Sequence, residues 1–299
     1  MGIIDTIRLK WREGSILLRL IFINIAVFVT LHVIALVFMF AGQQTHNFLQ
    51  WIEMPSAVSI LATRPWSIVT YMFAQFDLLH LLFNMLWLYW FGGIFLLSIT
   101  PKRMLALYIY GGIGGALTFM AAYNAMPLFD NTIGWLIGSS ASVIAIVVAT
   151  AMLHPDYRMN LLFIGSVSLK WIAIVTIGID LISIHDANAG GHIAHIGGAV
   201  VGAIYALSLK RGIDITGPFN SMIDKIVVAW GKITVQQPKT FKARRPKHGN
   251  HDTTKSRQAN PTDDQATLDA ILDKIKKSGY AALSQDEKRR LFDVSKRIK

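Results

Sequence analysis

The sequence predicts an all-α membrane protein with six transmembrane helices, and three observations support this fold class. The 299-residue chain is 53% hydrophobic and 16% charged, whereas soluble domains carry about 25% charged residues. Its first apolar stretch, Ser15–Ala41, contains Arg19 and His32 as its ionisable residues, and about 20 apolar residues cross a bilayer as a helix. Further apolar stretches follow closely, so the first is interpreted as a span and not as a cleaved signal peptide.

The six predicted spans share a high apolar content and few charges. They are Ser15–Ala41, Leu78–Ile99, Met104–Ala125, Gly134–Leu153, Val167–Ile184 and His192–Leu209. Together they define a predicted transmembrane domain over residues 1–211. The absence of an internal repeat disfavours a transporter built from inverted halves.

Basic residues collect on one side of the predicted bundle. They precede the first span, lie in the second-to-third turn, flank the fourth-to-fifth loop and follow the sixth span: Arg8, Lys10, Arg12, Lys102, Arg103, Arg158, Lys170, Lys210 and Arg211. The opposite loops contain Arg64 alone among basic residues. Because lysine and arginine favour the cytoplasmic side, we expect both termini in the cytoplasm.

Several segments lie outside the spans. The loop over residues 42–66 is rich in aromatic and apolar residues, and we expect it to lie on the outer leaflet. Residues 212–235 carry apolar side chains at helical spacing and predict an amphipathic helix on the cytoplasmic face. Residues 236–262 are polar and basic, which predicts a disordered linker. Residues 263–299 predict a small cytoplasmic helical hairpin with a capping box.

The charge and the cysteine content limit the possible functions. Most of the net charge of +11 follows residue 212, which favours attraction to a membrane surface over nucleic-acid binding. The chain contains no cysteine, so disulfides, a thiol nucleophile and thiolate metal ligands are excluded. No cofactor is expected.

Polar residues inside three spans lie at a common depth. The second span carries His80 and Asn84, the fourth carries Ser140 among other serines, and the sixth carries His192 and His195. All three helices start on the outer side, and each set falls within about 10 Å of that end at 1.5 Å per residue. Buried polar groups in a membrane usually face the bundle interior and indicate function. The spacing therefore predicts a site near the outer surface.

The residue types fit nucleophilic catalysis. His195 shares a helix stripe with Gly198 and Gly202, and small residues on a stripe allow another helix to approach closely. If that helix is the fourth, the His195 imidazole reaches Ser140 and acts as the general base that activates its hydroxyl. His80 and Asn84 are then candidates for stabilising the oxyanion, with backbone N–H groups near Ser140.

Three motifs resemble those of the rhomboid family. They are Gly138-Ser139-Ser140-Ala141, His80-Leu81-Leu82-Phe83-Asn84 and Ala194-His195-Ile196-Gly197-Gly198, in family order on the expected helices. The resemblance implies an intramembrane serine protease with a Ser140–His195 dyad and no third acid, which cleaves single-pass transmembrane substrates near the outer interface. It implies an oxyanion role for His80 and Asn84, and a bacterial cytoplasmic membrane as the location.

The sequence departs from the family pattern at three places. Ala141 stands where the family usually has glycine, and its methyl could tighten the oxyanion pocket. Ile144 replaces a frequent aromatic residue one turn after the nucleophile, and the outer loop carries Arg64-Pro65-Trp66 where relatives carry a Trp-Arg pair.

Simpler interpretations exist for each candidate residue. Ser140 could be a helix-packing serine, and His195 an interhelical contact. His192 is the second candidate for the base. His80 and Asn84 could be structural, and Asp180 in the fifth span fits an interhelical contact better than a third triad member.

Three other functions were weighed against the protease. A zinc site formed by His80, His192 and His195 lacks a His-Glu-x-x-His motif and is disfavoured. A proton pathway through His80, Asp180 and His195 needs polar groups across the whole bilayer, whereas these gather at one side. A catalytically inactive rhomboid-like protein that binds transmembrane clients remains the alternative.

Overall fold

The computed structural model describes residues 15–161, 164–185, 188–234, 271, 273–276, 283–289 and 291. The chain divides into two units, Met1–Gln236 and Gln237–Lys299. Four helices of the first unit are long and apolar enough to cross a membrane: α2 (Ile16–Phe40), α6 (Leu78–Phe95), α7 (Pro101–Ala125) and α10 (Ala189–Lys210). Among the described residues, two further apolar helices are shorter: α8 (Ser140–Leu153) and α9 (Leu169–Ile182).

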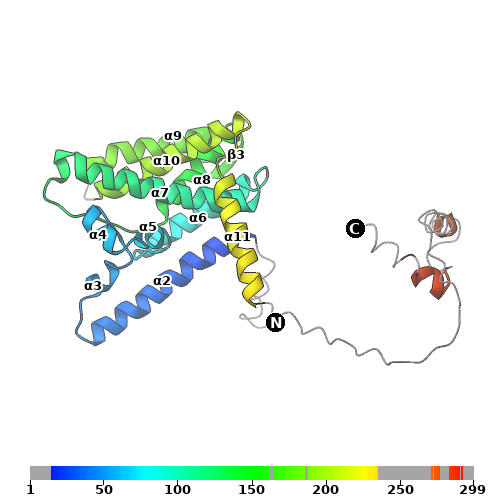
Figure 1. Ribbon diagram of the computed structural model, residues 1–299. Helices are drawn as coiled ribbons and strands as arrows, with labels where there is room; N and C mark the ends of the chain where they lie inside the picture. The colour runs from blue at the N-terminus through cyan, green and yellow to red at the C-terminus, as the bar shows by residue number, and fades with distance from the viewer. Residues whose placement is uncertain are drawn as a thin grey trace, which may run out of the picture. The chain divides into compact units, whose positions relative to one another are not determined.

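Helix α8 forms the centre of the bundle, where α6, α7 and α10 pack around it (Figure 1). Every residue from 141 to 151 is buried, as expected for a helix that is apolar on all sides. In contrast, α2 exposes apolar side chains such as Val29, Val33 and Leu36. A continuous apolar face of this kind suits contact with lipid.

The predicted start of the fourth span was wrong. Residues 134–139 do not belong to α8, because β2 (Trp135–Leu136) pairs antiparallel with β1 (Met54–Pro55). Strand β3 (Arg158–Leu161) pairs antiparallel with β4 (Gly165–Ser168), so α9 begins at Leu169, two residues after the predicted start of the fifth span. A short apolar stretch fits a strand as well as a helix, and periodicity alone does not distinguish them.

The loop between α2 and α6 contains short elements. They are α3 (Thr45–Leu49), α4 (Val58–Thr63), α5 (Ser67–Thr70) and η1 (Tyr71–Phe73). The Arg64 guanidinium lies 4.3 Å from the Trp51 ring centroid, and the rings of Trp51 and Trp66 stack at 6.2 Å. The aromatic residues of this loop therefore pack on one another as well as facing outward.

Main-chain contacts fix the distance between α8 and α10. A Cβ built at Gly198 would overlap the Ala141 carbonyl and lie 2.9 Å from its carbon. A Cβ at Gly202 would overlap the Ala145 carbonyl and lie 3.0 Å from its carbon. The two glycines predicted to allow close approach therefore contact the backbone of the fourth-span helix, as expected.

The described residues after α10 begin with the predicted amphipathic helix, α11 (Gly217–Thr234). Its Phe219 ring meets Tyr110 edge-on at 5.8 Å, and Asp224 pairs with Lys102 at 2.6 Å. The predicted linker, residues 236–262, lies outside the described residues. In the second unit, Glu287 N–H donates to Ser284 Oγ and Ser284 N–H donates to Glu287 Oε2, which confirms the capping box.

Candidate active site

Ser140 and His195 meet inside the first unit. Ser140 is the first residue of α8, and His195 lies nearly two turns inside α10. The Ser140 Oγ and His195 Nε2 atoms are 2.7 Å apart, a hydrogen-bond distance. The serine and the histidine selected from the sequence are therefore in direct contact, at the closely packed junction of α8 and α10.

The other ring nitrogen of His195 faces Asp180 on α9. His195 Nδ1 lies 2.7 Å from Asp180 Oδ1, and His192 Nδ1 lies 2.8 Å from the same oxygen. Asp180 is buried, with 5% of its surface exposed. The sequence favours an interhelical or loop-pinning contact for Asp180. The contact is interhelical, and one of its partners is the histidine that touches Ser140.

His192 lies on the Asp180 side of the cluster. It was the second candidate for the general base, but its side chain contacts Asp180 at 2.8 Å and not Ser140. The His192 and His195 rings meet edge-on with centroids 5.8 Å apart. The geometry therefore favours His195 for proton exchange with Ser140.

His80 and Asn84 lie one turn apart on α6 and share a cavity of about 260 Å³ with Ser140 and His195. A Cβ built at Gly138 would lie 3.0 Å from His80 Cε1 and 3.7 Å from Ser140 Oγ. Gly138 has φ +132°, a conformation open to glycine but strained for other residues. The absence of a side chain at Gly138, two residues before Ser140, thus leaves room for the His80 ring.

Asn84 also belongs to a buried polar network. Its Nδ2 donates to Gln75 Oε1 at 2.7 Å. The Gln75 amide nitrogen in turn donates to Asn24 Oδ1 at 3.1 Å and to Ser139 Oγ at 3.0 Å. This network links α2, α6 and the start of α8. The sequence analysis missed Gln75 and Asn24, although a lone asparagine in an apolar span signals a buried partner.

The serines beside Ser140 point elsewhere. Ser139 is fully buried in the Gln75 network. The Ser142 hydroxyl is buried without a hydrogen-bond partner, against Gly112 of α7. Of the three, Ser140 alone lines the cavity that His195 shares.

Two of the three departures from the family pattern lie near Ser140. Ala141 is buried, and a Cβ built at Gly115 of α7 would lie 2.5 Å from its methyl. The methyl therefore packs against α7. Ile144 lines the cavity that holds Ser140 and His195 and also contributes to a cluster with Val148.

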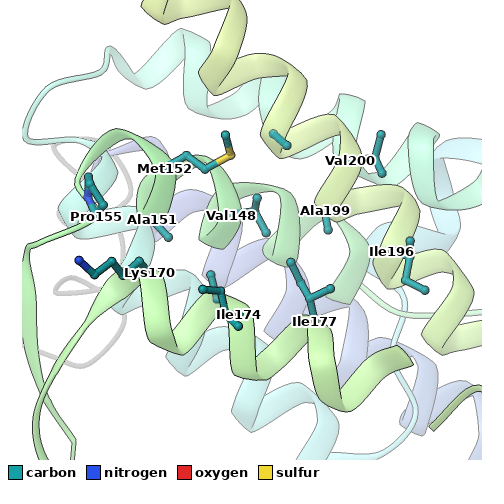
Figure 2. Close-up of a pocket in the computed structure, with 12 residues that line it drawn as sticks. Val148, Ala151, Met152, Pro155, Lys170, Ile174, Ile177, Ile196, Ala199 and Val200 are labelled. Carbon is teal, nitrogen blue, oxygen red and sulfur yellow. The ribbon is translucent and has the colours of Figure 1, made fainter. Parts of the chain in front are cut away.

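A second cavity lies between α8, α9 and α10 (Figure 2). It has a volume of about 450 Å³ and is lined almost entirely by aliphatic side chains. Val148 and Ala199 line it from α8 and α10, and Ile174 and Ile177 line it from α9, with Lys170 near one end. Helix α9 therefore borders two cavities, of which the one with Ser140 and His195 carries polar side chains among apolar ones and the other is almost entirely aliphatic.

A metal site fits the cluster less well than hydrogen bonds do. Among the described residues, Asp180, His192 and His195 each offer one potential ligand atom, and these atoms lie within 4.8 Å of one another. Two ligands of one tetrahedral zinc at about 2.0–2.1 Å stand about 3.3 Å apart. The separations of 2.7 and 2.8 Å are shorter and match hydrogen bonds.

The fold and the site define a class: a helical membrane protein in which a serine and a histidine meet inside the bundle. Residues 62–212, half of the chain, match the family model of the Rhomboid domain, and the chain belongs to the rhomboid family. Residues 258–297 match a family of unknown function, DUF6576.

Individual relatives agree with this family. The chain is 28% identical over 219 residues to RHOMBOID-like protein 12, mitochondrial, of Arabidopsis thaliana, covering 68% of this chain and 62% of the relative. It is 23% identical over 141 residues to Rhomboid protease GlpG of Yersinia pseudotuberculosis, covering 47% of each. A similar match covers half of Rhomboid-like protein 17, chloroplastic, of Arabidopsis thaliana at 22% identity and 49% of this chain. The chain thus spans about half to three-fifths of these relatives' length.

Proposed function

We propose that this protein is an intramembrane serine endopeptidase that hydrolyses transmembrane segments of single-pass membrane proteins. The observation that carries the proposal is the 2.7 Å contact between Ser140 Oγ and His195 Nε2, two partly buried residues that line one cavity. A serine hydroxyl is a weak nucleophile until an adjacent base accepts its proton. Membership in a family whose members act on membrane proteins in the bilayer supports the choice of substrate.

The proposed reaction has two halves. In the first, Ser140 Oγ attacks the scissile carbonyl carbon while its proton passes to His195 Nε2. The tetrahedral intermediate collapses to an acyl-enzyme when the carbon–nitrogen bond breaks and the proton passes to the leaving amine. In the second half, water attacks the acyl-enzyme, His195 accepts its proton, and Ser140 is released with that proton.

The oxyanion of each intermediate needs hydrogen-bond donors. His80 and Asn84 line the same cavity as Ser140. The first N–H groups of α8 add to them, because a helix N-terminus leaves backbone N–H groups without partners. Since Asn84 Nδ2 already donates to Gln75, its second Nδ2 proton is the one left for the oxyanion.

We extend the proposal to the arrangement in the bilayer. Helices α8 and α9 have 14 residues each, so each rises about 21 Å. Together with the flanking segments over residues 134–139 and 158–168, they complete six crossings with α2, α6, α7 and α10. The distribution of lysine and arginine then places both termini in the cytoplasm. A bacterial cytoplasmic membrane stays a prediction, since the named relatives include mitochondrial and chloroplast proteins.

Cleavage of a single-span reporter in liposomes tests the proposal. We expect wild type to cut near one end of the reporter helix, and Ser140→Ala and His195→Ala to abolish cutting while the melting temperature holds. Ser142→Ala is the matched control, because its hydroxyl is buried away from the cavity. Cleavage that survives Ser140→Ala overturns the assignment of the nucleophile.

The alternative function predicts a different result. A catalytically inactive member that binds transmembrane clients would retain the reporter on the protein without cutting it. Retention of several reporters by wild type, with equal retention by Ser140→Ala and no product, would favour that alternative.

A further inference from the structure

We propose that Asp180 is a positioning residue for His195, and that one of its carboxylate oxygens holds both His195 and His192. The inference rests on the proposed function and extends it: the resemblance to the family implies a serine–histidine pair without a third acid. In this chain, Ser140, His195 and Asp180 form a continuous hydrogen-bonded chain across α8, α10 and α9.

The carboxylate fixes the tautomer of both rings. An ionised carboxylate only accepts hydrogen bonds, so His195 Nδ1 and His192 Nδ1 each carry the proton of their bond to Asp180 Oδ1. His195 Nε2 is then left with its lone pair directed at Ser140 Oγ, 2.7 Å away. This is the tautomer that a general base needs, and the other tautomer would put a proton where the lone pair must be.

The same contact favours the charge that forms during the reaction. When His195 takes the proton of Ser140, the ring becomes an imidazolium, and Asp180 lies 2.7 Å from its Nδ1. Burial strengthens this attraction, because little water screens it. Asp180 is 5% exposed, and an isolated buried carboxylate is costly. His192 donates the second hydrogen bond to Asp180 and thereby offsets part of the free-energy cost of burying the carboxylate. A neutral His192 ring does this without adding a charge.

Other titratable groups near His195 come from three helices. His80 on α6 lines the shared cavity, His192 lies on α10 itself, and Asp180 lies on α9. From α8 the facing group is the hydroxyl of Ser140. Among the described residues of this cluster, Asp180 is the single acidic group, so its replacement removes the negative charge beside the base.

Labelling with a fluorophosphonate probe tests the inference without a protein substrate. Ser140 Oγ forms the phosphorus–oxygen bond, fluoride leaves, and the hydroxyl proton passes to His195. Asp180→Asn keeps the size of the side chain and removes its charge. We expect the labelling rate and kcat to fall at least about tenfold, compared with about 10⁴-fold for the equivalent change in chymotrypsin-like proteases, with KM for the reporter unchanged within about twofold.

A comparison of kcat, KM and melting temperature separates positioning from simple structural support. Positioning of the His195 ring predicts a lower kcat in Asp180→Asn at an unchanged KM and an unchanged melting temperature. Asp180→Glu should restore part of the rate, because it keeps a carboxylate on α9. Asp156→Asn is the matched control, since Asp156 is an exposed carboxylate that pairs with Lys170.

Each outcome decides a separate question. Wild-type labelling that is lost in Ser140→Ala but equal in rate in Asp180→Asn overturns the positioning role and leaves the protease intact. A fall in rate that is matched by a fall in melting temperature and is not restored in Asp180→Glu also overturns it. Absence of labelling in wild type overturns the proposed function itself. Loss of activity on adding a chelator would indicate that Asp180, His192 and His195 bind a metal ion, and this would overturn the hydrogen-bonded arrangement.

Discussion

Replacing Gly198 by alanine tests whether the main-chain contact between α8 and α10 sets the catalytic geometry. The new Cβ would lie 2.9 Å from the Ala141 carbonyl carbon, whereas carbon atoms pack at about 3.5–4.0 Å. The helices must therefore separate by about 0.6–1.1 Å. Neither neighbour can give way by a rotamer change, because the contact involves backbone atoms.

The separation acts directly on the reacting pair. His195 lies one turn before Gly198 on α10, and Ser140 precedes Ala141 on α8. If the shift is transmitted in full, the 2.7 Å distance between Ser140 Oγ and His195 Nε2 grows to about 3.3–3.8 Å, beyond an ordinary hydrogen bond. A misplacement of about 1 Å costs about 10²-fold in rate, and overpacking destabilises by about 1–3 kcal/mol.

The assay compares reporter cleavage and melting temperature in the same liposomes or detergent. Gly93→Ala on α6 is the matched control, because a Cβ there meets no atom within 4 Å. We expect Gly198→Ala to lose about 10²-fold in kcat while Gly93→Ala stays within about twofold. Wild-type kcat and melting temperature in Gly198→Ala would refute the argument that this contact sets the distance.

Further predictions concern the parts that hold the site. Gln75→Ala should destabilise the protein by about 1–3 kcal/mol, because it leaves buried amide and hydroxyl groups without partners. Thermal unfolding measures this, with Gln75→Glu compared alongside. An unchanged melting temperature in Gln75→Ala would contradict the prediction. Ser56→Ala should cost about 1 kcal/mol, since the Ser56 hydroxyl accepts the N–H that precedes β2, and limited proteolysis should then cut the β1–β2 region faster. Burial raises the pKa of Asp214, but hydrogen bonds from Thr216 and the Arg103 contact outweigh it and leave the pKa below its ordinary value. The stabilisation is therefore complete above the ordinary pKa of about 3.9 and is lost as pH falls through the lowered folded value. Asp214→Asn should remove this acid-side dependence of the melting temperature, and an identical dependence in wild type and variant would refute it.

Counting residues along the helices was sufficient to predict four of the polar residues that line the cavity, His80, Asn84, Ser140 and His195. Thr176 and Asp180 of α9 line it as well and were not predicted there. The catalytic roles of the first four stay predictions. The contact of Asp180 with His195 could not be foreseen, since one acidic residue in an apolar helix does not fix how that helix is rotated.

The helix boundaries were less predictable for a different reason. The segment before Ser140 is apolar and follows a glycine, which fits the first turn of a span. Its pairing with Met54 and Pro55, about 80 residues earlier, is a long-range contact that local periodicity does not encode. Gln75 was overlooked because it lies between spans, where polar residues are ordinary.

The glycine contacts of α8 also determine which sequence changes can be compensated. A Cβ at Gly111 of α7 would overlap the Cβ of Ala145, so a second change, Ala145→Gly, would remove the overlap and leave contacts of 3.2 Å to the Ala141 oxygen and the Ser142 Cα, which a small shift relieves. A Cβ at Gly198 or Gly202 would overlap a carbonyl oxygen instead, and every amino acid on α8 carries that oxygen. Related chains can therefore carry a larger residue on α7 when a smaller one stands opposite it on α8. No substitution on α8 makes room for a larger residue at Gly198 or Gly202, because the backbone carbonyl remains.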